Sequence, residues 1–273
     1  MCKNVAAVVS ALSFTLVSLA DEPKSAPADP AEIERLVKEI EASPLPPNLL
    51  RGDGLPSALA RQPYDAASLK PYLVDRVSAV DILAEPDKHP LASAAIQAGE
   101  RLRKLAKGEP ARFQMEFRSP ITPMFKKQVQ LLQRGPARAL AELDDIAELL
   151  EKATEKRKSE RSPRWQAHFD LLQARLNLWR VAVHEYDLLL GQIRKDELPE
   201  LDAAKNNNGW RIVAAEKIQS SADVRRLAKD AVKHLAKVEA DYPGTPWATL
   251  AKQDQTLQLG LEWQPAKLPM LKK

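Results

Sequence analysis

Cysteine is nearly absent from this chain of 273 residues, and the only one is Cys2. A single cysteine cannot form an internal disulfide. No later cysteine provides a thiol nucleophile, a metal ligand or a lipid attachment site. The sequence therefore predicts a mature chain without disulfides and without a thiol nucleophile.

Glycine is also scarce, with nine residues, about half of the ~7% that is usual. Few glycines disfavour tight hairpins and glycine-rich phosphate-binding loops. The chain contains no Walker loop, no G-x-G-x-x-G, no G-x-S-x-G and no histidine pair at i, i+4. We therefore expect a protein that is not an enzyme and that holds no cofactor or metal.

The 21 prolines are unevenly distributed, because 14 of them lie in residues 21–123 and few follow until residue 243. This predicts a loop-rich front and a helical remainder. We divide the chain into a linker with a short helix (21–48), a loop-rich lead with short helices (49–84), a helical domain (85–265) and a tail (266–273). The composition, 44% hydrophobic and 29% charged, is sufficient for a core.

The N-terminus has the pattern of a secretory signal peptide. Lys3 precedes an apolar stretch, Val5–Val17, and Ser18-Leu19-Ala20 has the small-x-small form of a cleavage site. We expect residues 1–20 to be removed after Ala20 and the protein to be periplasmic or extracellular. The apolar stretch is shorter than the ~20 residues that span a bilayer, so no membrane span is expected.

The strongest periodic signal predicts one long helix from Pro163 to about Arg194. Apolar residues recur there at alternating spacings of four and three, and a second apolar face (Leu171, Leu178, Val181 and Leu188) places this helix between neighbours. The predicted core residues of the first face are Trp165, Phe169, Leu172, Leu176, Trp179, Val183, Tyr186 and Leu190.

A helical hairpin is predicted near the C-terminus. One amphipathic helix ends at Pro243-Gly244, and Thr245-Pro246 begins the next, whose Trp247 is a further core residue. Such hairpins are the unit of tetratricopeptide-like (TPR-like) arrays. The predicted fold class is all-α: an antiparallel helical bundle or TPR-like hairpins with one long central helix and a loop-rich N-terminal lead.

Only Arg112–Phe117 has the alternation of a strand. A lone strand cannot satisfy its own backbone, so we expect an extended segment packed on the helices. Leu259–Trp263 is expected to fold back onto the bundle.

Two polar patterns have both a functional and a structural interpretation. Asp170, Asn177 and His184 recur every seven residues, but members ~10 Å apart cannot share a metal ion, so a solvated stripe is favoured. Basic residues are dense in Lys152–Arg164. No aromatic is interleaved there, so a solvated helix end is favoured over an anionic surface contact, and no nucleic-acid partner is expected.

The connection from Asp196 to Ser221 is the better functional candidate, because long loops without periodicity are often functional. Asn206-Asn207-Asn208-Gly209 indicates a turn, and the apolar Trp210 follows it. Either Trp210 docks into the helices and fixes the loop, or Asn208 and Trp210 contact a ligand or partner.

Several short motifs resemble the helical region that follows the von Willebrand factor A domain in a group of exported bacterial proteins of unassigned role. The A domain itself is missing, because its adhesion motif begins Asp-x-Ser and no Asp-x-Ser occurs here. The resemblance is clearest over about residues 110–265 and implies no catalytic residues. The motifs are Ser162-Pro163-Arg164-Trp165 through Asp170-Leu171, Glu185-Tyr186, Asn208-Gly209-Trp210, Pro243 through Ala248, and Leu259 through Trp263.

The sequence thus favours an exported, non-enzymatic helical scaffold or protein-interaction module with a protein partner in the exported compartment. The alternative is a module that binds a small ligand or a cell-wall or extracellular polymer through residues 196–221. The oligomeric state stays open.

Overall fold

A computed structural model describes residues 29–41, 50, 64, 66–73, 77–108 and 113–269. The predicted signal peptide and its cleavage site after Ala20 lie outside the described residues. The fold is mostly helical, as the sequence predicts, but it also contains a three-stranded sheet, so the all-α expectation is wrong in this respect. No helix within the described ranges is long and apolar enough to cross a membrane.

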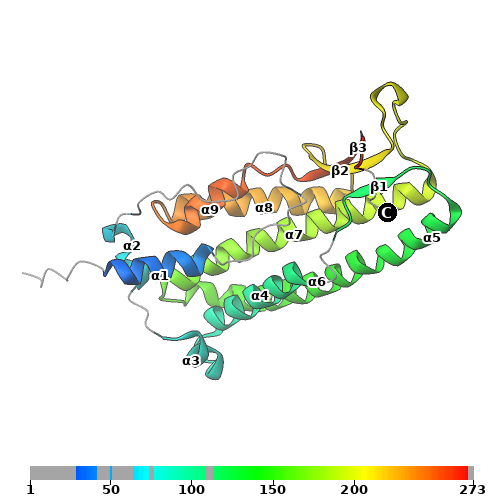
Figure 1. The fold of residues 1–273 in the computed structure, drawn as a ribbon. Coiled ribbons are helices and arrows are strands. Elements are labelled where there is room, and N and C mark those ends of the chain that lie inside the picture. The colour runs from blue at the N-terminus through cyan, green and yellow to red at the C-terminus, as the bar shows by residue number, and fades with distance from the viewer. Residues whose placement is uncertain are drawn as a thin grey trace, which may run out of the picture.

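Among the residues that the structure describes, the short helices α1 (Pro30–Glu41), α2 (Ala66–Leu73) and α3 (Ala79–Ala84) precede the main helical body. The Asp29 carboxylate accepts a hydrogen bond from the Ala31 N–H at 3.0 Å and thereby caps α1. α1 buries Leu36 and Ile40 and lies near the N-terminal end of the longest helix (Figure 1).

The body is built around α7 (Pro163–Lys195), which begins at the cap Ser162 and ends at Asp196 in the left-handed conformation. Figure 1 shows α6 (Arg134–Thr154) along one side of α7 and α8 (Ala222–Asp241) along the other. The remaining helices of the body are α4 (Pro90–Lys107), α5 (Pro123–Leu132) and α9 (Pro246–Asp254), and the short 3-10 turns are η3 (Glu155–Lys158) and η4 (Ala203–Lys205).

α7 is buried on opposite faces, because helices cover both of its apolar stripes. One face packs with α4 and α6 in a cluster that contains Trp165, Phe169 and Trp179. The other packs with α8, α9 and the sheet in a second cluster. Tyr186 and Leu190 belong to this second cluster, so their assignment to the first face is wrong. The nine side chains assigned to the core from the sequence are all at most 6% exposed.

The hairpin between α8 and α9 turns at Gly244, whose φ of +73° is a conformation that disfavours other residues. Thr245 then caps α9, because its Oγ1 accepts a hydrogen bond from the Ala248 N–H at 3.3 Å. These are the residues from which the hairpin is predicted.

The sheet has the order β1-β2-β3 and is antiparallel throughout: β1 (Glu116–Arg118), β2 (Gly209–Ala215) and β3 (Gly260–Ala266). The expectation of an unpaired extended segment at 112–117 is therefore wrong for residues 115–117, which bond to β2, whereas Arg112 lies outside the described residues. The segment 259–263 does fold back, but as a strand. One sheet face packs against the helices with the buried side chains Phe117, Trp210, Ile212, Leu261 and Trp263.

Two glycines permit a close approach of backbone segments in and beside the sheet. A Cβ on Gly209 would lie 2.4 Å from the Phe117 carbonyl oxygen, and one on Gly260 would lie 2.1 Å from the Lys217 carbonyl oxygen. Both contacts are with backbone, which cannot move aside as a flexible side chain does. The connection 196–221, predicted to lack regular structure, thus contains the central strand of the sheet.

Candidate functional site

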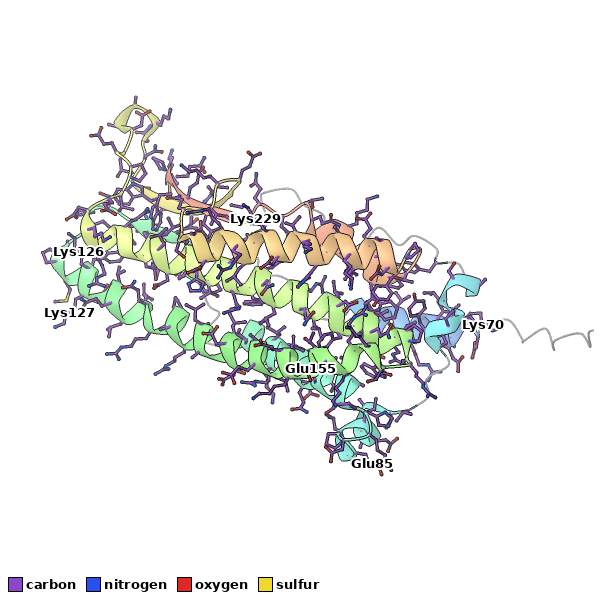
Figure 2. All side chains as sticks on the ribbon, turned by 180° about the vertical axis from the view of Figure 1, so that it is seen from behind. Lys70, Glu85, Lys126, Lys127, Glu155 and Lys229 are labelled. Atoms are coloured by element: carbon purple, nitrogen blue, oxygen red, sulfur yellow. The ribbon has the colours of Figure 1, made fainter. Side chains whose placement is uncertain are left out.

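The outer side of α8 forms an open groove with an apolar floor, which we call the α8 groove. It has a volume of about 700 Å³ and is bounded by α8, by the connection between β2 and α8 and by Leu259. Figure 2 shows Lys229 on the side of α8 that faces away from α7. The apolar lining residues are Ile218, Ala228, Val232, Ala236 and Leu259, of which Val232 is 42% exposed.

The rim of the α8 groove is positively charged. Lys217, Arg225, Lys229 and Lys233 line it together with one acidic residue, Glu216. Among the described residues the three lysines make no ion pair, and the Arg225 guanidinium donates to the neutral Ser220 carbonyl. The groove therefore combines exposed apolar surface with an uncompensated positive field.

A buried carboxylate positions the wall of this groove. Glu185 on α7 is 1% exposed and accepts hydrogen bonds from the backbone N–H groups of Gln219 at 3.0 Å, Ser220 at 2.8 Å and Leu261 at 3.2 Å. The Gln219 side chain also donates to the Leu261 carbonyl at 2.7 Å. Glu185 thus joins α7, β3 and the connection that carries Lys217 and Ile218.

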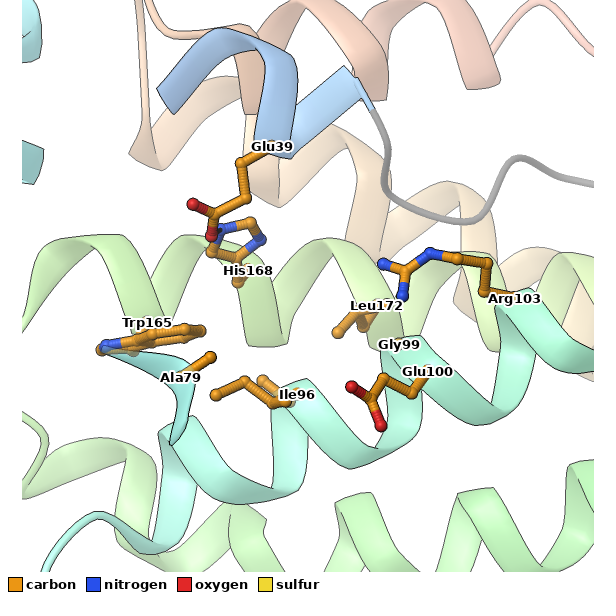
Figure 3. A pocket seen from close by; sticks show the side chains of 10 residues that line it. Glu39, Ala79, Ile96, Gly99, Glu100, Arg103, Trp165, His168 and Leu172 are labelled. Carbon is orange, nitrogen blue, oxygen red and sulfur yellow. Dashed lines mark ion pairs between the residues drawn. The ribbon is translucent and has the colours of Figure 1, made fainter. Parts of the chain in front are cut away.

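A second hollow, which we call the α1 pocket, has a volume of about 240 Å³ and lies among α1, α3, α4 and α7. Its apolar lining includes Ile96, Gly99 and Leu172, with Trp165 at one end (Figure 3). Its polar lining consists of Glu39, Glu100, Arg103 and His168. Figure 3 shows Glu100 and Arg103 extending from neighbouring turns of α4 toward the pocket.

Glu39 is held as a carboxylate. Burial alone would raise its pKa, but hydrogen bonds from His168 and Arg164 outweigh this effect and lower the pKa from 4.5 to about 2. Arg164 forms an ion pair with Glu39 and also lies over the Trp165 ring, 5.3 Å from its centroid. Glu39 therefore attaches α1 to α7 at the edge of the pocket.

His168 lies between two tryptophans, with ring centroids 5.4 Å from Trp165 and 5.2 Å from Trp247. Burial lowers its pKa, although the nearby Glu39 acts in the opposite direction, so the ring is neutral at pH 7. Its Nε2 is 3.5 Å from Glu39 Oε1. Figure 3 shows the other ring nitrogen turned away from Glu39, toward the Arg103 side of the pocket.

The interpretation of the polar stripe on α7 as a solvated surface is wrong for Asp170. Asp170 is 7% exposed, receives two hydrogen bonds from Arg157 at 2.6 and 2.5 Å and accepts one from the Tyr242 hydroxyl at 2.7 Å. The hydrogen bond to Asp170 raises the pKa of Arg157. Asn177 and His184 are half-buried on the same helix. Within the described ranges, no group of three or more metal-ligating side chains is arranged to hold a metal ion.

The basic stretch 152–164 is likewise only partly a solvated helix end. Lys152, Lys156 and Lys158 are exposed, as expected, but Arg157 and Arg164 are bound by Asp170 and Glu39. Their carboxylate partners lie outside the stretch, so charge density along the sequence does not reveal the pairing.

The two contact candidates of the 196–221 connection have partners inside the fold. The Asn208 side chain accepts a hydrogen bond from the Leu268 N–H at 2.7 Å and donates to the Leu268 carbonyl at 3.1 Å. Trp210 is 8% exposed, and its indole N–H donates to the Pro199 carbonyl at 2.7 Å. Asn208 thus fixes the chain that follows β3, and Trp210 fixes the connection before β2 at Pro199.

Sequence reasoning missed the α8 groove and the α1 pocket for different reasons. Lys229, Val232 and Lys233 lie on the outward face of a helix that the sequence predicts. An exposed valine between two lysines was therefore a sign of the α8 groove that the sequence contains. The pocket brings Glu39 of α1 beside His168 of α7, and two residues so far apart in the sequence form no local pattern. Comparison with protein-family models, curated proteins and solved structures found no match to this chain.

Proposed function

We propose that this protein is an exported, non-enzymatic protein-interaction module whose helices form an antiparallel bundle with a TPR-like C-terminal hairpin. The observation that carries the proposal is the α8 groove, which offers an apolar floor between unpaired basic side chains. Exposed apolar surface with a polar rim is typical of protein-binding sites.

The occupant that best fits the groove is an acidic amphipathic helix of a partner protein. The stripe from Arg225 to Ala236 spans about 16 Å along α8, or three helical turns. A helix laid into such a groove presents apolar side chains at i, i+4 and i+7 to the floor. Acidic side chains on its flanks would meet Lys229 and Lys233.

The resemblance to the helical region after an A domain suggests which partner to test first. In those exported proteins the helical region and the A domain belong to one chain, so a protein that carries an A domain is a natural partner in trans. The connection 196–221 is less favoured as the binding site, because Asn208 and Trp210 already have internal hydrogen-bond partners.

The proposal is tested with a fluorescent amphipathic peptide whose apolar face is flanked by glutamates. We expect micromolar binding that weakens with added salt, because exposed charges are screened beyond about 10 Å at 0.1 M. The variant Lys229→Glu/Lys233→Glu should lose at least about tenfold in affinity, and Val232→Asp, which introduces a charge on the floor, a similar amount.

A matched control keeps the change in net charge the same. Lys127→Glu/Lys156→Glu reverses two exposed lysines on α5 and η3, remote from the groove, and should bind as the parent does. Equal losses in both double variants would show a general charge effect and contradict the groove. Binding to anionic vesicles but not to the peptide would also contradict it.

A further inference from the structure

The α1 pocket carries an inference beyond protein interaction, because it has both a built interior and unused polar groups. His168 is 8% exposed, and its Nε2 faces the Glu39 carboxylate at 3.5 Å.

The ring of His168 presents a defined surface to the pocket. Because Glu39 is ionised and faces Nε2, the proton of the neutral ring is favoured on Nε2. The other nitrogen, Nδ1, then carries a lone pair and accepts hydrogen bonds. Figure 3 shows this nitrogen on the side of the pocket toward Arg103.

Glu100 and Arg103 supply opposite charges on the facing wall. They lie one turn apart on α4, and neither makes an ion pair among the residues that the structure describes. Between them and His168 the floor is apolar, with Ile96 and Leu172. Besides Glu39, which is paired with Arg164, the pocket thus offers one carboxylate, one guanidinium and one acceptor nitrogen around an apolar surface.

We infer that the α1 pocket binds a small zwitterion, an α-amino acid with an apolar side chain. Its carboxylate pairs with Arg103, its ammonium is received by Glu100 and His168 Nδ1, and its side chain lies on Ile96 and Leu172. The volume of about 240 Å³ equals that of about eight water molecules at ~30 Å³ each, which suits a ligand the size of leucine.

The test is a calorimetric titration of the full chain with L-leucine and with two analogues that each lack one charge. We expect leucine to bind at least about tenfold more tightly than 3-methylbutylamine, which lacks the carboxylate, or 4-methylpentanoate, which lacks the ammonium. The dipeptide Leu-Gly distinguishes a free amino acid from a peptide N-terminus and should bind more weakly, because its carboxylate is displaced.

Variants of the two surface residues assign the contacts without disturbing the core. Arg103→Ala should lose at least about tenfold for leucine with little change for the amine, whereas Glu100→Gln should weaken leucine with little change for the acid. Lys104→Ala, an exposed neighbour that does not line the pocket, is the control and should bind as the parent does.

The outcomes that overturn the inference are equally specific. They are no heat of binding with leucine at millimolar concentration, equal binding of leucine and either analogue, equal binding of Leu-Gly, or leucine affinity that is unchanged in both variants. Melting temperatures of the variants that match the parent ensure that a lost signal reports the site and not unfolding.

Discussion

Replacing Glu185 with alanine should destabilise the fold more than any comparable change of a surface carboxylate. The Glu185 carboxylate accepts three backbone N–H groups, from Gln219, Ser220 and Leu261. A buried donor left without an acceptor costs about 1–3 kcal/mol. With three such donors, the upper range of the loss in unfolding free energy is about 3–9 kcal/mol. Water can enter near the half-buried Ser220, so we expect about 3–5 kcal/mol.

Glu185→Gln should lose only part of the stability that Glu185→Ala loses, because one side-chain oxygen remains. Oε2 accepts two of the N–H groups and Oε1 accepts one. A glutamine that keeps its oxygen at the Oε2 position leaves its NH₂ opposite the Ser220 N–H, and the loss falls to about 1–3 kcal/mol. The expected order of stability is therefore parent, Glu185→Gln, Glu185→Ala.

The assay is urea unfolding at pH 7, with the free energy of unfolding extrapolated to water. Glu262→Ala, an exposed carboxylate on β3, is the control and should change stability by less than about 0.5 kcal/mol. Hydrogen exchange at Gln219, Ser220 and Leu261 should accelerate in Glu185→Ala. A loss below about 1 kcal/mol, with exchange unchanged at these amides, would refute the anchoring role of Glu185.

Three further changes test the sheet, the core and the attachment of α1. Gly260→Ala places a Cβ 2.1 Å from the Lys217 carbonyl oxygen, so we expect a loss of about 1–3 kcal/mol in urea unfolding, and an unchanged midpoint would contradict this. Trp179→Ala removes a side chain that is 3% exposed and should cost about 3–5 kcal/mol; a melt within a couple of degrees of the parent would reject its placement. Glu39 has a folded pKa of about 2, below its ordinary 4.5, so its stabilising contribution is present above about pH 4.5 and is lost as the pH falls toward 2. Parent and Glu39→Gln should therefore differ in unfolding free energy at pH 7 and converge near pH 2, and a difference that does not change with pH would contradict the Arg164 ion pair.

The helices could be predicted because their signals are local. α7 follows from the spacing of its apolar residues and from Ser162-Pro163, and the α8–α9 hairpin from Gly244 and Thr245. Caps and helical faces involve residues within a few positions of one another, so one sequence is sufficient to recognise them.

The sheet and both hollows depend on contacts between distant segments. Glu116 and Arg211 form a cross-strand ion pair over 95 positions, so the alternation around Phe117 gave no sign of its partner. In β3 the alternation of Leu261 and Trp263 with exposed residues was present but short. Asp170 is bound by Arg157, 13 positions away, and by Tyr242, 72 positions away. Neither partner belongs to the helical repeat of α7, so the buried carboxylate looked like part of a solvated stripe.

The most direct test of the proposed function is to locate the bound peptide by crosslinking. In a Cys2→Ser background, Val232→Cys places a single thiol on the floor of the α8 groove, and Val80→Cys places one on α3, where the valine is 76% exposed. An acidic amphipathic peptide with a thiol-reactive group on its apolar face should modify Val232→Cys much faster than Val80→Cys, and added salt should remove the difference. Equal rates at the two positions would contradict a binding site in the α8 groove.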